Sequence, residues 1–162
     1  MVDISKYSLK ELLGFAVRSE IDSNQTYSNL AHRLKNPLLK EKFQLLAYEE
    51  TKHKETLENL FGSIFPGEQI RVPEKQSEEL FKKIQVTPSS SLVDILKQAM
   101  DSEKSAENFY ANLAKQIENT KKRILEYLSK VEHSHFRMLE GELSLALEYE
   151  DYAEKPIDKV VT

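Results

Sequence analysis

The chain has 162 residues, 40% hydrophobic and 31% charged, which is an ordinary composition for one globular domain. It contains no cysteine, which excludes disulfides, thiolate catalysis, zinc ribbons and iron–sulfur clusters. The formal charge of −4 argues against nucleic acid and anionic membranes as partners. The first residues lack the apolar core of a signal peptide, and no stretch approaches transmembrane length. We therefore expect a cytoplasmic protein with no membrane partner.

Long stretches without glycine or proline predict helices. A first helix is expected from about residue 8, with Ser8 as N-cap and Glu11 at the capping-box position. It should end at about residue 35, before the Asn-Pro pair, because a residue that precedes proline avoids the α region. A second helix is expected at about 37–60, with a break near Gly62.

Residues 62–90 contain two of the four glycines and three of the five prolines, so they predict a long connection. Within it, 73–84 is compatible with a short helix that starts near Pro73. A third helix is expected after the sequence TPSSS, to about residue 118, and a fourth after ENTKK, to about residue 149. The predicted organisation is one helical domain at 1–150 and a C-terminal tail at 151–162.

Short, long and short connections join these four helices. They predict an all-α fold of two helical hairpins linked by a crossover, the topology of a ferritin-like four-helix bundle. An open array of helical hairpins is the alternative, but the apolar seams described next favour closure into one bundle.

Each predicted helix carries a seam of apolar residues separated by steps of four and three, which is the spacing of one helix face. Near the middle of each helix, polar residues interrupt the seam. These are Glu20, Glu50, His53, Glu103, Glu132 and His135. A closed bundle would bring all six into a single layer.

The second half of the chain repeats the first half, including these interruptions. Glu20 pairs with Glu103 and Tyr27 with Tyr110 at a separation of 83 residues, while Glu50 pairs with Glu132 and His53 with His135 at 82. The chain is therefore an internal duplication in which the polar seam residues have been kept.

Four carboxylates buried together cannot all remain ionised unaided, because desolvation and mutual repulsion raise their pKa values. Two divalent cations would balance the four charges, with the two imidazoles as neutral ligands. Oxygen-rich ligation with one nitrogen for each metal suits two iron ions, or manganese, better than tetrahedral zinc. One Glu-x-x-His motif alone usually marks a solvated face, but two duplicated copies on the seam predict a dinuclear site. Glu50 and Glu132 are expected to bridge the two ions.

Glu20, EETKH at 49–53, Glu103 and EHSH at 132–135 resemble the pattern of rubrerythrin-type di-iron proteins of the ferritin-like superfamily. The resemblance covers about residues 8–149. It implies that Tyr27 and Tyr110 lie beside the metal centre and hydrogen-bond to ligand carboxylates. Read from the seam alone, ordinary core tyrosines are the alternative interpretation of both.

The chain departs from this family in two ways. Full-length rubrerythrin carries a rubredoxin-like iron site of four cysteines, so an external electron donor such as a rubredoxin is implied here. Rubrerythrin also has a further glutamate three residues after its third-helix ligand, where this chain has Ala106. Glu107 is one step further on, turned away by about 100°. His133 is expected to point off the seam, either into solvent or beside the ligands, and His32 is expected to be a surface residue.

The resemblance implies an oxidoreductase that reduces hydrogen peroxide or dioxygen, with a homodimer as the expected assembly. The alternative is a ferroxidase or an iron-binding or storage protein of the same superfamily, for which storage would require a large hollow shell. A third hypothesis is a structural helical module that retains a vestigial site.

Overall fold

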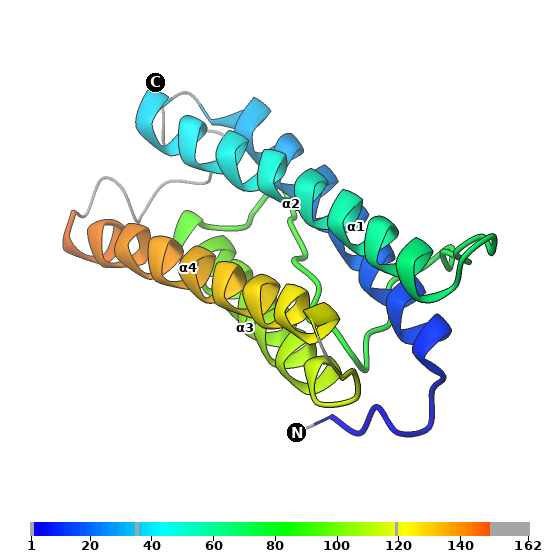
Figure 1. Ribbon diagram of the computed structural model, residues 1–162. Coiled ribbons are helices and arrows are strands. Elements are labelled where there is room, and N and C mark those ends of the chain that lie inside the picture. Colours follow the sequence, from blue (N-terminus) through cyan, green and yellow to red (C-terminus); the bar gives the residue numbers. More distant parts are fainter. Residues whose placement is uncertain (1, 35, 119, 150–162) are drawn as a thin grey trace.

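The computed structural model describes residues 2–34, 36–118 and 120–149. It contains four helices, α1 (Leu9–Arg33), α2 (Pro37–Ile64), α3 (Leu92–Ala114) and α4 (Thr120–Glu148). Helices α1 and α2 form one hairpin, α3 and α4 form a second, and α2 also contacts α4 (Figure 1). The predicted all-α bundle of two hairpins is confirmed. Lys35, where the first helix was expected to end, and the predicted tail at 151–162 lie outside the described residues.

Side-chain caps mark the starts of the first three helices. Ser8 forms the predicted capping box with Glu11, because the Ser8 hydroxyl accepts from the Glu11 amide and the Glu11 carboxylate accepts from the Ser8 amide. Asn36 caps α2 ahead of Pro37, and the Ser91 hydroxyl accepts from the amide of Asp94 in α3. None of the described helices is both long enough and apolar enough to cross a membrane.

Two predicted helix ends are wrong. Helix α2 continues through Gly62 to Ile64, and the chain turns instead at Gly67, whose φ of 78° suits glycine. Helix α3 ends at Ala114 instead of about residue 118. The amides of Lys115, Gln116 and Ile117 bond to carbonyls three residues back, so the chain tightens into a 3₁₀-type turn there.

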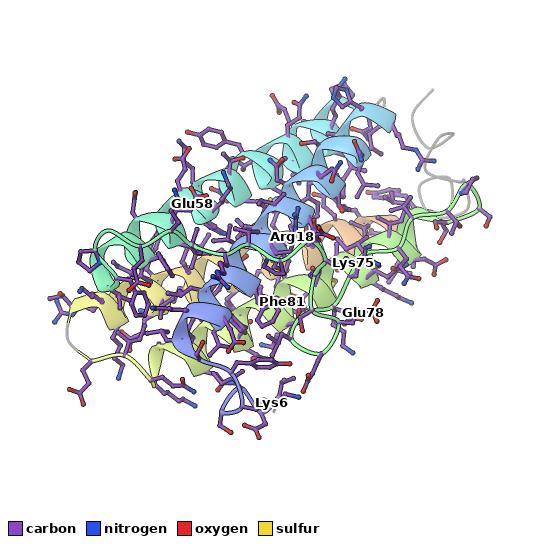
Figure 2. The ribbon with its side chains drawn as sticks, turned by 90° about the vertical axis from the view of Figure 1, so that its right-hand side faces the viewer. Lys6, Arg18, Glu58, Lys75, Glu78 and Phe81 are labelled. Carbon is purple, nitrogen blue, oxygen red and sulfur yellow. The ribbon has the colours of Figure 1, made fainter. Side chains whose placement is uncertain are left out.

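The predicted short helix at 73–84 is also wrong, because this part of the crossover has only one hydrogen-bonded turn, from Ser77 to Phe81. The crossover is held instead by bonds to the bundle. The Gln76 amide group donates to the Ser19 hydroxyl of α1, and the Lys82 backbone amide donates to the Ser105 hydroxyl of α3. Figure 2 shows Lys75, Glu78 and Phe81 on the crossover as it passes α1, where Arg18 is labelled.

Two apolar clusters fill the bundle, and each helix contributes to both. The first contains Leu13, Leu57, Leu113 and Leu128. The second contains Leu30, Leu46, Leu96 and Leu139. Along every helix, the polar seam residues lie between the residues of the first cluster and those of the second. The polar layer is therefore closed on both sides by packed hydrocarbon.

Candidate metal centre

The six polar seam residues are all buried in the middle of the bundle. The most exposed, His53, has only 4% of its surface accessible. Helices α1 and α3 each contribute one glutamate, whereas α2 and α4 each contribute a glutamate and the histidine one helical turn later. The structure thus brings together all six residues that the sequence singled out.

Their ligand atoms form two adjacent clusters. The His53 cluster consists of Glu20, Glu50, His53 and Glu132, and the His135 cluster consists of Glu50, Glu103, Glu132 and His135. In each, one atom from every side chain lies within 4.8 Å of the others. Two clusters of three carboxylates and one imidazole fit a dinuclear metal site.

Glu50 and Glu132 belong to both clusters, and each directs one oxygen to each histidine. Oε2 of Glu50 lies 3.3 Å from Nδ1 of His53, and Oε1 lies 3.6 Å from Nδ1 of His135. Oε1 of Glu132 is 2.9 Å from Nδ1 of His53, and Oε2 is 3.2 Å from Nδ1 of His135. This split of the two oxygens is compatible with a carboxylate that bridges two ions.

Glu20 and Glu103 each belong to one cluster. Oε2 of Glu20 lies 3.6 Å from Nδ1 of His53, and Oε2 of Glu103 lies 3.4 Å from Nδ1 of His135. The second oxygen of each accepts a hydrogen bond from a buried tyrosine of the opposite hairpin. Tyr110 donates to Glu20, and Tyr27 donates to Glu103. The hydrogen bonds that the resemblance implied for the two tyrosines are therefore present.

The centre contains buried polar atoms that the protein itself does not satisfy. Among the described residues, Nδ1 of His53, Nδ1 of His135 and both oxygens of Glu132 are buried without a hydrogen-bond partner, although charged groups lie close by. Such atoms are costly in a protein interior unless another partner binds them. The two oxygens of Glu132 each lie next to one of the two Nδ1 atoms, so the donor set fits a pair of cations.

Burial controls the ionisation of the two outer glutamates. Desolvation, followed by the neighbouring charge of Glu50, raises the pKa of Glu20 to about 8. Desolvation and the charges of Glu50 and Glu132 also raise the pKa of Glu103 well above its usual value. Without metal, burial therefore favours the protonated form of both carboxyls.

The pKa values of the shared glutamates and of the histidines shift in the direction that favours their charged forms. Burial pushes the pKa of Glu50 and of Glu132 upward, but contacts with the histidines and, for Glu50, with Glu20 outweigh it and lower both values. Burial alone would lower the pKa of each histidine, but the facing carboxylates raise both well above the usual range. These directions favour carboxylates paired with imidazolium groups in the metal-free protein, so metal binding would compete with protons.

Two glutamates that contact other side chains across the bundle were missed by the sequence interpretation. Glu49 contacts Nε2 of His135 from α2, and its signal was the adjacent pair of glutamates in EETKH. Glu142 is 4% exposed and forms an ion pair with Lys42 across α2 and α4. Glu142 follows Leu139 by three residues, so one further step along the fourth seam would have found it.

The other positions considered from the sequence, which are Ala106, Glu107, His133 and His32, lie outside the two clusters. Ala106 packs against the first apolar cluster. Glu107 pairs with Lys104 at 3.0 Å and with His133 at 3.3 Å, on the outer side of the bundle. The His133 side chain is 51% exposed, and His32 is exposed as well, so the solvent-facing interpretation of His133 and the predicted surface position of His32 are confirmed.

The amino-acid sequence that builds this site matches a known protein family. The sequence model of the rubrerythrin family matches residues 11–143, which include all six residues of the two clusters. The chain belongs to the rubrerythrin family. Within its 162 residues, this rubrerythrin-family protein has no cysteine and so no four-cysteine rubredoxin site. A comparison with curated proteins found no match.

Two solved structures are similar to this rubrerythrin-family chain. A hypothetical protein from Pyrococcus furiosus is 34% identical, with a TM-score of 0.79, and the match covers 90% of this chain and 94% of that one. KatB, a manganese catalase from Anabaena PCC7120, is 18% identical, with a TM-score of 0.62, and the match covers 90% of this chain and 76% of that one. At 18% identity, the second similarity shows the ferritin-like fold alone.

Proposed function

We propose that this protein is a non-haem di-iron oxidoreductase that reduces hydrogen peroxide with electrons from an external donor protein. The observation that carries the proposal is the division of the Glu50 and Glu132 oxygens between the two histidines, in a family defined by rubrerythrin. When bound, the metal pair would supply the two electrons that convert one hydrogen peroxide and two protons into two water molecules.

The residues of the chain have distinct parts in this proposal. Glu20, Glu103, His53 and His135 would each bind one ion, whereas Glu50 and Glu132 would bind both. Tyr27 and Tyr110 would hold the outer carboxylates in place through their hydroxyl groups. The apolar clusters on either side would exclude bulk water, which strengthens the electrostatic interactions within the layer.

Iron is the metal we propose, and manganese is the alternative, because both accept oxygen-rich ligation with a single imidazole. A rubredoxin-type protein is the proposed donor and a homodimer is the proposed assembly. Metal analysis of anaerobically purified protein tests the metal, and native mass tests the assembly. A large cage instead of a dimer would favour iron storage.

Ferroxidase activity, with dioxygen as oxidant, is the second candidate, and Ala106 favours it. Because position 106 carries no carboxylate, the two clusters have the same composition, three glutamates and one histidine each. Stopped-flow oxidation of the diferrous protein by each oxidant at equal concentration separates the two functions. Faster oxidation by peroxide, with turnover when a rubredoxin-type donor is supplied, is the expected result. Faster oxidation by dioxygen without peroxide turnover would establish the ferroxidase instead.

A further inference from the structure

Glu49 lies on α2 immediately before Glu50 and reaches across the bundle to His135 on α4. Its Oε2 contacts Nε2 of the imidazole, whereas Nδ1 of the same ring faces the carboxylates of the His135 cluster. A carboxylate accepts hydrogen bonds and donates none, so the ring carries its hydrogen on Nε2. Once a metal displaces any proton from Nδ1, the lone pair of Nδ1 would be directed at the position where that metal binds.

In the part of the chain that the structure describes, the His53 cluster has no equivalent support. The position that corresponds to Glu49 in the second repeat, 82 residues later, is Val131, which carries no hydrogen-bonding group on its side chain. Within the described residues, Nε2 of His53 makes no hydrogen bond or ion pair. The contacts of the His53 ring with carboxylates all involve its other nitrogen, Nδ1. The duplication therefore preserves the two clusters but not the group behind each histidine.

The accessibility of the two side chains fits a supporting role for Glu49. The Glu49 side chain is 37% exposed at the edge of the bundle, whereas the His135 side chain is 4% exposed. Among the described residues, Glu49 thus contacts the centre only through His135, and its partly exposed side chain can be replaced without opening the apolar core.

We propose that Glu49 positions His135 and makes the His135 cluster the tighter of the two metal-binding halves, so that it takes up the first ion. A carboxylate behind a ligating histidine fixes the tautomer and ring orientation and makes the ligand more basic, and its loss typically lowers metal affinity 10- to 100-fold. This inference rests on the proposed metal centre but is independent of peroxide chemistry. In the metal-binding protein, the two nearly identical clusters would fill one after the other.

Titration of the metal-free protein with Mn²⁺, followed by the electron paramagnetic resonance signal of the unbound ion, measures the two affinities. Anomalous diffraction from crystals prepared with one equivalent of Mn²⁺ then identifies the occupied half. For the unaltered protein we expect two steps at least about 10-fold apart, with the first ion in the His135 cluster. Equal occupancy, or first occupancy of the His53 cluster, would overturn the proposal.

Variants test whether Glu49 causes the difference. Glu49→Leu should bring the two affinities together and divide the first equivalent between the clusters. Glu49→Gln should give an intermediate result, because the amide oxygen still accepts from Nε2. Val131→Glu places a carboxylate at the equivalent position beside His53 and should tighten that half. Glu55→Gln is the matched control, because Glu55 is exposed on the same helix and pairs only with Lys52 among the described residues.

Circular dichroism of each metal-free variant verifies its fold before titration. An unchanged first affinity in Glu49→Leu would show that Glu49 does not position His135. Absence of Mn²⁺ and Fe²⁺ binding by the unaltered protein would reject the metal centre itself, together with this proposal. Ordered metal uptake without any peroxide reduction would reject only the proposed activity.

Discussion

Tyr27 on α1 donates a hydrogen bond to Glu103 on α3, in the opposite hairpin. The duplication repeats the bond in reverse, because Tyr110 on α3 donates to Glu20 on α1. The same contact is thus made twice, with the two repeats exchanged, which is the pattern that a two-fold axis produces. The two halves of this chain therefore meet as the subunits of a symmetric dimer do, with the metal centre at their junction.

Removal of Tyr27 should cost stability in the metal-free protein. Tyr27→Phe leaves the facing oxygen of Glu103 buried without its donor, so we expect the unfolding free energy to fall by about 1–3 kcal/mol. Urea unfolding of the variant and of the unaltered protein measures this difference in unfolding free energy. Tyr7→Phe is the control, because the Tyr7 hydroxyl bonds to Glu79 at the surface and its loss should change stability by less than about 0.5 kcal/mol. Equal losses of unfolding free energy in the two variants would show that the buried hydrogen bond stabilises the protein no more than the surface one.

The shared and the outer glutamates should differ in how much metal they hold. Glu50→Ala and Glu132→Ala each remove oxygens from both clusters, so we expect fewer than one tightly bound ion per chain. Glu20→Ala affects only the His53 cluster and should retain the ion of the other half. Elemental analysis after gel filtration measures the ratio. Retention of two ions by Glu50→Ala would contradict its bridging role.

The stability of the metal-free protein should decrease as pH rises from about 4.5 to about 8. The pKa of Glu20 is raised from 4.5 to about 8 on folding, and burial is the main cause. A group with a raised folded pKa favours the folded state below its unfolded pKa, and that contribution is lost as pH rises through the folded value. The lowered pKa values of Glu50 and Glu132 act mainly below pH 4.5, outside this window.

Bound metal should reverse that trend, because cations replace the protons that the ligands hold. The gain in Tm on adding Fe²⁺ anaerobically should therefore be larger at pH 7.5 than at pH 5.5. Thermal melts of the metal-free and the metal-loaded protein at both pH values measure this gain in Tm. A gain that is independent of pH would argue against displacement of protons from buried ligands.

Gly14 should be intolerant of any side chain. A Cβ at this position of α1 would lie 2.2 Å from the carbonyl oxygen of Arg71, a backbone atom of the crossover. Gly14→Ala should lower the unfolding free energy by about 1–3 kcal/mol, because the crossover must move. Gly141→Ala is the control on α4, where a Cβ would meet no described atom within 4 Å beyond its chain neighbours and its own helix backbone, and should stabilise by about 0.5–1 kcal/mol. Denaturant unfolding of both variants measures the difference.

The sequence by itself determined the four helices, their pairing into hairpins and the six residues of the centre. Helical periodicity is a local property, so the steps of four and three that contain Glu50 and His53 place both on one face whatever that face meets. The duplication then identified which polar positions matter, since a chance Glu-x-x-His motif would not recur with its seam glutamate.

Only the tertiary structure decided which atoms meet across the bundle. The contacts of Tyr27 with Glu103 and of Glu49 with His135 depend on how far one hairpin slides and turns against the other, which no periodicity within a helix encodes. The crossover at 73–84 shows the same limit, because hydrogen bonds to Ser19 and Ser105 replace the helix that its own residues allow. Local spacing assigns side chains to a face, whereas distances between faces are set by packing over the whole core.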